Sequence, residues 1–263
     1  MKFQRLTVGP VALLLCSVLG AGVAGAAAAP SKQAVNAAFP KGAYAALNAL
    51  PDWGGVWVLA RPKPPAPGEP PRERPQLKGE YLKRYEAWQN EVKSNSGVVR
   101  RETSNCMPPG MPNMLATAQY PIEFLFTPGR VTVHHEAWMQ WRSIYTDGRG
   151  HPDDLEPGVF GHSTAHWDGQ VLVVDTVGIK TITELGPGIK HSPKLHIVER
   201  MHLDAKDPQT FIDEVTLDDA DALAQPYHIT HTFTRQREWS LMEFVCAEND
   251  RNPVDESGHT ILQ

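Results

Sequence analysis

The sequence predicts a mainly β fold: an antiparallel β-barrel with one N-terminal helix and a proline-rich linker. From Tyr120 onward, short segments of β-forming residues alternate with turn residues, and no helical periodicity interrupts them. Asp168-Gly169 lies between two such segments and is typical of a two-residue hairpin turn. A closed barrel is favoured over a sandwich because closure protects the strand edges and encloses an interior pocket.

The first 29 residues are predicted to be a secretory signal peptide. Lys2 and Arg5 precede an apolar run, and small residues around Ala26 offer cleavage sites. Cleavage there leaves 25 − 2 = 23 basic residues against 30 acidic ones, so we expect no nucleic-acid partner. No later segment is apolar enough to span a bilayer, so we expect no membrane contact after cleavage. The expected location is periplasmic or secreted.

The rest of the chain is predicted to be one domain with a short segment at each end. The predicted segments are an arm over residues 30–50, a single barrel domain over 51–250 and a tail over 251–263. Within the domain, seven prolines in residues 61–75 exclude a helix and predict an extended linker. Residues 79–95 show an apolar stripe at helical spacing, which predicts the one helix.

The predicted strands are short and evenly spaced. They cover residues 56–59, 122–126, 131–145, 162–167, 170–176, 195–203, 210–217, 227–235 and 239–247. Residues 131–145 are one long strand or a bent pair. Residues 178–192 are a long loop.

The hairpin around Asp168-Gly169 gives a specific pairing. Counting outward from a two-residue loop pairs His166 with Val171, Thr164 with Val173, and His162 with Asp175. Side chains alternate between faces, so these six share one face. A carboxylate beside His162 would hold the imidazole in one tautomer for acid–base chemistry. The alternative is a structural cross-strand hydrogen bond.

The segment 131–142 contains a second candidate cluster. Read as one strand, it places five side chains on one face: His134, Glu136, Trp138, Gln140 and Arg142. Apolar walls with a few orienting polar groups are typical of a binding pocket, although the same face could simply meet solvent.

We expect this face to meet that of His162 in the barrel lumen. Arg142 would then bind a substrate carboxylate or phenolate, and His134 and Glu136 would serve as acid and base. His166 and His231 are expected to complete the pocket wall.

Two cysteines remain in the mature chain, Cys106 and Cys246. In an oxidising compartment they are expected to form a disulfide, with two free buried thiols as the alternative. No metal site is predicted, because the chain has no His-Glu-x-x-His helix and no cysteine ligand set. A two-histidine, one-carboxylate site assembled from separate strands stays open. The absence of a glycine-rich phosphate loop or dinucleotide motif predicts no cofactor.

Several short motifs between residues 51 and 249 resemble a family of secreted bacterial proteins, mostly of unassigned function. They are Tyr120-Pro121, Thr127-Pro128-Gly129-Arg130-Val131, Tyr145-Thr146-Asp147-Gly148-Arg149, Gly161-His162-Ser163 and Val173-Val174-Asp175-Thr176. The resemblance implies a lipocalin-like β-barrel and carries no activity.

These features favour a periplasmic, cofactor-independent acid–base enzyme of lyase, decarboxylase or isomerase type. Its expected partner is a small apolar substrate, preferentially aromatic, that bears an anionic or phenolic group. The alternatives are a non-catalytic lipocalin-like carrier of a small hydrophobic ligand and a metal-assisted hydrolase. A homodimer is compatible with the sequence.

Overall fold

The computed structural model describes residues 43–61, 68, 73–97, 99–100, 106–117, 120–246, 256 and 261–262. The predicted signal peptide and most of the predicted linker and tail lie outside the described residues. The chain divides into two compact units, Met1–Pro40 and Lys41–Gln263, and every described residue belongs to the second. Among the described residues, no helix is long and apolar enough to cross a membrane.

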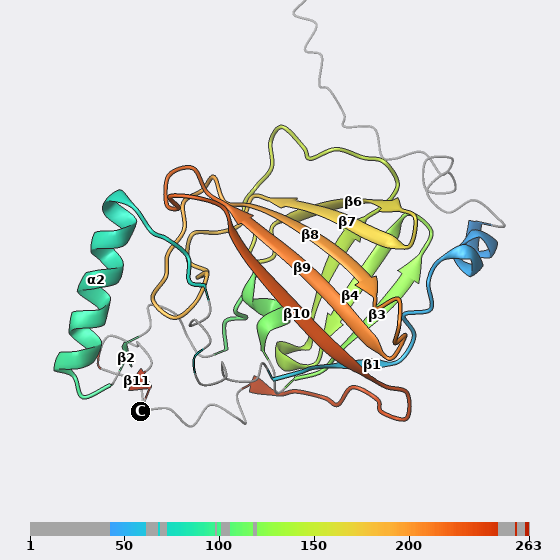
Figure 1. The fold of residues 1–263 in the computed structure, drawn as a ribbon, viewed down its shortest axis with the longest axis horizontal. Coiled ribbons are helices and arrows are strands. Elements are labelled where there is room, and N and C mark those ends of the chain that lie inside the picture. The colour runs from blue at the N-terminus through green and yellow to red at the C-terminus, as the bar shows by residue number, and fades with distance from the viewer. Residues whose placement is uncertain are drawn as a thin grey trace, which may run out of the picture. The chain divides into compact units, whose positions relative to one another are not determined.

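Nine described strands close into a β-barrel (Figure 1). In the order of their hydrogen bonding they are β1 (Val56–Leu59), β10 (Tyr227–Gln236), β9 (Thr210–Asp218), β8 (His196–Leu203), β7 (Val171–Val177), β6 (His162–Asp168), β5 (Gln140–Tyr145), β4 (Arg130–His135) and β3 (Ile122–Thr127). Strand β3 then pairs with β1 and completes the barrel. The predicted barrel is confirmed. Its purely antiparallel arrangement is wrong at one place, because β5 and β6 run parallel.

Smaller elements surround the barrel. The predicted helix is α2 (Gly79–Ser94), and its Trp88 ring lies against Gly188, where a Cβ atom would be 2.3 Å from the ring. The described part of the chain contains three short 3-10 helices: η1 (Ala43–Ala49), η2 (Asn113–Ala116) and η3 (Ala137–Met139). The strands β2 (Val99–Arg100) and β11 (Ile261–Leu262) pair with each other. The described part of the predicted strand 239–247 is irregular and forms no strand.

Aromatic side chains pack together in one part of the barrel interior. Trp53 packs against Phe124 and Phe211 with ring centroids 5.0 and 4.8 Å apart, and Trp57 lies 5.4 Å from Phe211. A ligand cavity would leave its lining side chains accessible, yet Trp57 and Phe211 are 0% exposed. This part of the lumen is therefore packed as a hydrophobic core.

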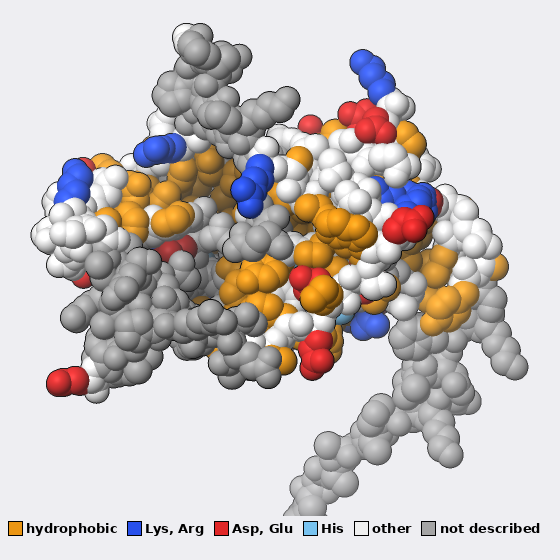
Figure 2. Space-filling model, turned by 90° about the horizontal axis from the view of Figure 1, so that it is seen from below, with side chains coloured by type: hydrophobic (Ala, Val, Ile, Leu, Met, Phe, Trp, Pro, Cys, Tyr) orange, Lys and Arg blue, Asp and Glu red, His pale blue; other side chains and the backbone are white. Residues whose placement is uncertain are grey.

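Some hydrophobic side chains also reach the surface. On the face seen in Figure 2 they form several patches, with acidic and basic side chains between and around them. The large exposed ones include Trp141 on β5 and Leu125 on β3.

The predicted disulfide is present and joins Cys106 to Cys246 with a Cα–Cα distance of 5.5 Å.

Residues 131–145 form the bent pair rather than one long strand. Strands β4 and β5 are antiparallel, with His135 opposite Gln140, and η3 makes the turn. Trp138 and Met139 take φ values of 60° and 47° there. The predicted shared face is therefore wrong, because the turn reverses the chain. Arg142 points into the barrel, whereas His134 is on the outer side, opposite Trp141.

The β6–β7 hairpin is confirmed, but its turn lies one residue later than predicted. Asp168 pairs with Val171, so the pairs are His166 with Val173, Thr164 with Asp175 and His162 with Val177. Compared with the prediction, each residue of β6 pairs with a β7 residue two positions later in the sequence. A shift of two leaves every side chain on its predicted face. This face is the outer surface of the barrel, because the alternate residues Ser163 and Thr176 are the buried ones. The predicted position in the lumen is wrong.

The parallel pair explains the path of the next segment. A parallel neighbour requires the chain to return along the sheet before the second strand begins. Residues 146–161 make this return without a strand or helix, and arc beside β6 and β7 (Figure 1). At the end of this connection Gly161 has φ 65°, and a Cβ atom would lie 2.6 Å from the carbonyl oxygen of Val177. Only glycine fits where the chain turns into β6.

Candidate functional site

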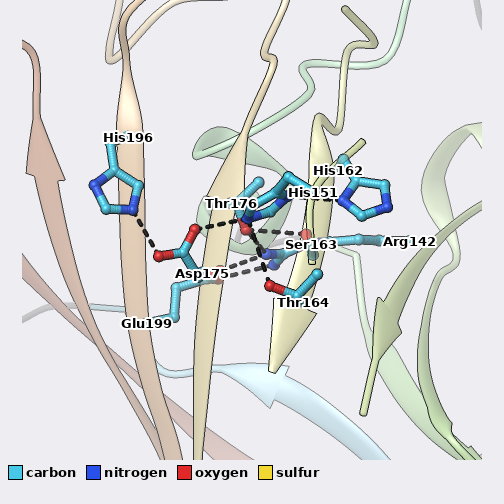
Figure 3. A network of polar contacts seen from close by, with 9 residues as sticks. All are labelled: Arg142, His151, His162, Ser163, Thr164, Asp175, Thr176, His196 and Glu199. Atoms are coloured by element: carbon cyan, nitrogen blue, oxygen red, sulfur yellow. Dashed lines mark hydrogen bonds and ion pairs between the residues drawn. The ribbon is translucent and has the colours of Figure 1, made fainter. Parts of the chain in front are cut away.

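A chain of four polar side chains crosses the outer face of β6, β7 and β8 (Figure 3). Asp175 lies at its centre. Its Oδ1 is 2.9 Å from Nε2 of His151, and its Oδ2 is 2.8 Å from Nε2 of His196. Nδ1 of His151 in turn lies 2.8 Å from Nδ1 of His162. One carboxylate thus holds two imidazoles, and one of these contacts a third.

Each member of this chain comes from a different element. His162 opens β6, Asp175 is in β7, and His196 opens β8. His151 is in the connection that the parallel pair requires, which brings it over the sheet. The sequence predicted His162 and Asp175 as neighbours, and the structure brings them together only through His151.

Electrostatics keep Asp175 ionised and His162 neutral near pH 7. Partial burial works to raise the pKa of Asp175, but the hydrogen bonds from His196 and His151 outweigh it and hold this pKa below its usual value. Partial burial lowers the pKa of His162, and the nearby charges of His151 and Arg149 act in the same direction. Asp175 is therefore an ionised acid at the centre of this chain of side chains, and His162 is a neutral imidazole at its end.

The ionised state of Asp175 fixes the hydrogen on the His151 nitrogen that faces it. An ionised carboxylate only accepts, so Nε2 of His151 carries a hydrogen and donates it to Asp175. One hydrogen lies between the two Nδ1 atoms, and in the arrangement in which Nδ1 of His162 donates it, Nδ1 of His151 is the acceptor. Nε2 of His162 is left with a free lone pair, and no described residue hydrogen-bonds to it. This nitrogen is a candidate general base.

A surface groove of about 330 Å³ lies next to this chain. Its size falls at the lower end of the roughly 300–1,000 Å³ that small-molecule pockets span. Its lining includes Asp175, Thr164, Arg149 and the apolar Val173 and Val198, whereas His151, His162 and His196 are not among the lining residues. The predicted binding residue His166 also lines the groove and is exposed.

Arg149 connects the groove to the histidines through a stack of side chains. Its guanidinium lies 4.0 Å from the centre of the Tyr145 ring, and that ring stacks on His162 with centroids 5.4 Å apart. Asp147 accepts hydrogen bonds from Nε and Nη2 of Arg149 at 2.6–3.0 Å. The guanidinium is therefore held in a fixed plane beside the candidate base.

The other predicted site residues lie elsewhere. Arg142 is enclosed in the lumen, where Nη1 donates to Glu199 at 2.8 Å and Nη2 also contacts the second Glu199 oxygen. It further donates to Ser163 at 3.0 Å and to Thr176 at 2.8 Å. With 2% of its surface exposed, Arg142 cannot reach a ligand in the groove, which corrects its predicted role.

The remaining five, with Trp138 of η3 among them, lie elsewhere on the barrel. Nδ1 of His134 lies 3.0 Å from Glu123, and Glu136 accepts a hydrogen bond from the backbone of Met242 at 2.8 Å. Gln140 donates to the carbonyl oxygen of Trp138 at 2.7 Å. His231 faces the interior, 3.5 Å from Asp213. None of them contributes to the groove, so the predicted cluster of His134, Glu136 and Arg142 does not exist as one site.

Sequence reasoning missed His151, His196 and Arg149. His196 follows a long loop, so its place beside Asp175 cannot be counted from a tight turn. His151 and Arg149 are in a polar connection with no periodicity. The Tyr145-to-Arg149 motif was a signal that could have drawn attention to this connection, since it ends at the cation beside the groove.

Four buried polar side chains in the barrel interior form a cluster that supports the site. Arg142, Ser163, Thr176 and Glu199 come from four successive strands, β5 to β8. Ser163 and Thr176 each lie within one residue of a groove residue, Thr164 and Asp175. Because β5 and β6 share only two residue pairs, these buried hydrogen bonds help to fix their relative position.

Within the described residues, no group of three or more His, Cys, Asp or Glu side chains is arranged to hold a metal ion. Comparison with known proteins adds no assignment, because no family model and no curated protein matches the chain. Functional inference therefore depends on the geometry of the site.

Proposed function

We propose that the protein is a cofactor-independent acid–base enzyme of lyase, decarboxylase or isomerase type that works in the outer groove. Its substrate is small, apolar and preferentially aromatic, with an anionic or phenolic group. The observation that carries this proposal is Asp175 hydrogen-bonded to two histidines, one of which orients His162. The signal-like N-terminal sequence supports a periplasmic or secreted location.

The proposed chemistry is proton transfer by His162. Its free Nε2 takes a proton from the substrate, and the imidazole becomes a cation. The hydrogen bond from Nδ1 of His162 to His151, and from His151 to Asp175, passes this positive charge toward a carboxylate. Arg149 stabilises the negative charge that develops on the substrate. Return of the proton to another atom completes an isomerisation, while its delivery to a carbon that has lost CO₂ completes a decarboxylation.

The packed lumen supports an enzyme acting at the outer groove over a lumenal carrier. Carriers of the lipocalin type enclose their ligand within the barrel, but aromatic side chains and a buried ion pair occupy much of this interior. The lipocalin-like assignment itself stays a proposal, supported by the hairpin connections of β6 to β10. The homodimer is also a proposal, and the exposed Trp141 and Leu125 are compatible with it.

A turnover screen tests the enzyme proposal. Aromatic carboxylic acids and phenylpropanoids are incubated with the wild type, His162→Ala and His228→Ala, and products are followed by NMR. His228 is an exposed histidine on β10 and is the matched control. We expect His162→Ala to lose about 10²–10⁴-fold in kcat, which is the usual contribution of a general base, and His228→Ala to keep wild-type turnover.

The pH profile gives an independent readout. Because the pKa of His162 is below its usual value, kcat/KM should rise with pH below neutrality and be level at pH 7 and above. Compounds that bind in the groove without product formation would refute the enzyme proposal. Unchanged turnover in His162→Gln would show that another group is the base.

A further inference from the structure

We propose that Arg149 is the anion-binding residue of the groove and that it takes a carboxylate or phenolate on the substrate through two parallel hydrogen bonds. This assignment rests on the proposed function for the nature of the substrate. It replaces Arg142, the anion-binding residue that the sequence predicted. Arg142 is 2% exposed and each of its three nitrogens already donates a hydrogen bond inside the barrel, so it has no edge available to a ligand.

The hydrogen bonds of Arg149 leave one edge of its guanidinium open. Asp147 takes the hydrogen on Nε and one on Nη2. No described residue accepts a hydrogen bond from Nη1. The two Nη1 hydrogens and the second Nη2 hydrogen therefore form a free fork, whose geometry matches the two oxygens of a carboxylate.

The guanidinium is held in place before a ligand arrives. Asp147 fixes one edge, and the Tyr145 ring, 4.0 Å away, supports its face. A flexible surface arginine would lose side-chain freedom on binding an anion, and this preorganisation reduces that loss.

The charges around the groove set the orientation of a bound anion. Arg149 attracts it, whereas the ionised Asp175, which lines the same groove, repels it. Val173 and Val198 supply apolar lining for the body of the ligand. A flat ring with one acidic group fits this pattern of charges.

Binding measurements with benzoate and benzamide test the assignment. These probes have nearly the same shape and differ in charge. The proteins are the wild type, Arg149→Gln and, as a matched control, Arg237→Gln. Arg237 is a surface arginine paired with Asp52, and its 52% side-chain exposure matches the 50% of Arg149.

We expect isothermal titration calorimetry to show benzoate binding about 10–100-fold more tightly than benzamide to the wild type, the range for hydrogen bonds to a charged group. Arg149→Gln should remove this preference, and Arg237→Gln should keep it. Tyr145→Leu should weaken the preference and Tyr145→Phe restore it. Equal binding of the two probes to the wild type, or equal benzoate affinity in the two arginine variants, would overturn the assignment.

These outcomes separate the inference from the proposed function. An Arg149-dependent preference for benzoate without any turnover supports the anion site and refutes the enzyme. Turnover of an aromatic carboxylate with the same KM in Arg149→Gln as in the wild type supports the enzyme and refutes the anion site.

Discussion

Replacing Asp213 by asparagine should stabilise the protein at neutral pH. Asp213 is on β9, is 0% exposed, and neither of its carboxylate oxygens has a hydrogen-bond partner. Burial raises the pKa of Asp213 to about 6, and the nearby Glu199 carboxylate acts in the same direction. His231 and Arg142 oppose this change without cancelling it.

The magnitude follows from the difference between the folded and unfolded pKa values. A rise from 3.8 to about 6 is about two pKa units, and at ~1.4 kcal/mol per unit it corresponds to ~3 kcal/mol. Because the folded pKa is the higher one, this contribution to stability is fully present below pH 3.8 and is lost as the pH rises through about 6. Above that range the native state carries a buried carboxylate whose contact with His231 does not offset the cost of its burial, and asparagine lacks this charge.

Urea denaturation at pH 4 and pH 7.5, with the disulfide intact, measures this difference. We expect Asp213→Asn to exceed the wild type by up to ~3 kcal/mol at pH 7.5 and to match it closely at pH 4. Asp218→Asn, at the exposed end of the same strand, is the control and should stay within about 0.5 kcal/mol at both pH values. A loss of stability that is equal at both pH values would refute the reasoning.

Three further substitutions test other parts of the structure. Glu199→Gln leaves the buried Arg142 charge without its counter-ion and should destabilise the protein by ~3–5 kcal/mol in urea denaturation, whereas a change below ~1 kcal/mol would contradict the buried pair. Met139→Gly should raise stability by up to ~1 kcal/mol, because φ is 47° at this residue; Met139→Ala keeps the strain and should show no such gain in thermal denaturation. Cys106→Ser opens a loop with a sequence separation of 140 and should remove about 4–5 kcal/mol; its stability should equal that of the reduced wild type.

Local sequence signals were enough to predict the barrel strands and the β6–β7 hairpin. Alternation with a period of two and glycine-containing turns depend on neighbouring residues alone. The same signals also placed His162 and Asp175 on one face, since a register shift of two residues keeps every side chain on its side. They did not determine which side of the barrel this face occupies.

The turn between β4 and β5 explains the main error. Trp138 and Met139 take positive φ values, which are uncommon for bulky residues and carry no turn signature in the sequence. Without that turn, residues 131–142 appear as one alternating strand. The structure holds the turn by contacts distant in sequence: Tyr120 and Phe244 pack around Trp138 with ring centroids 6.0 and 5.7 Å away.

The position of the candidate site depends on the one parallel strand pair. If β5 and β6 were antiparallel, a short hairpin could join them. The connection between them would then not need to pass over the outer face of β6 and β7. The parallel pairing requires the connection 146–161, and this connection brings Arg149 and His151 to Asp175. The pairing is only two residues long, so the buried contacts of Arg142 with Ser163 and Glu199 help to hold it from inside. It follows that Glu199→Gln, although remote from the groove, should weaken benzoate binding as well as stability.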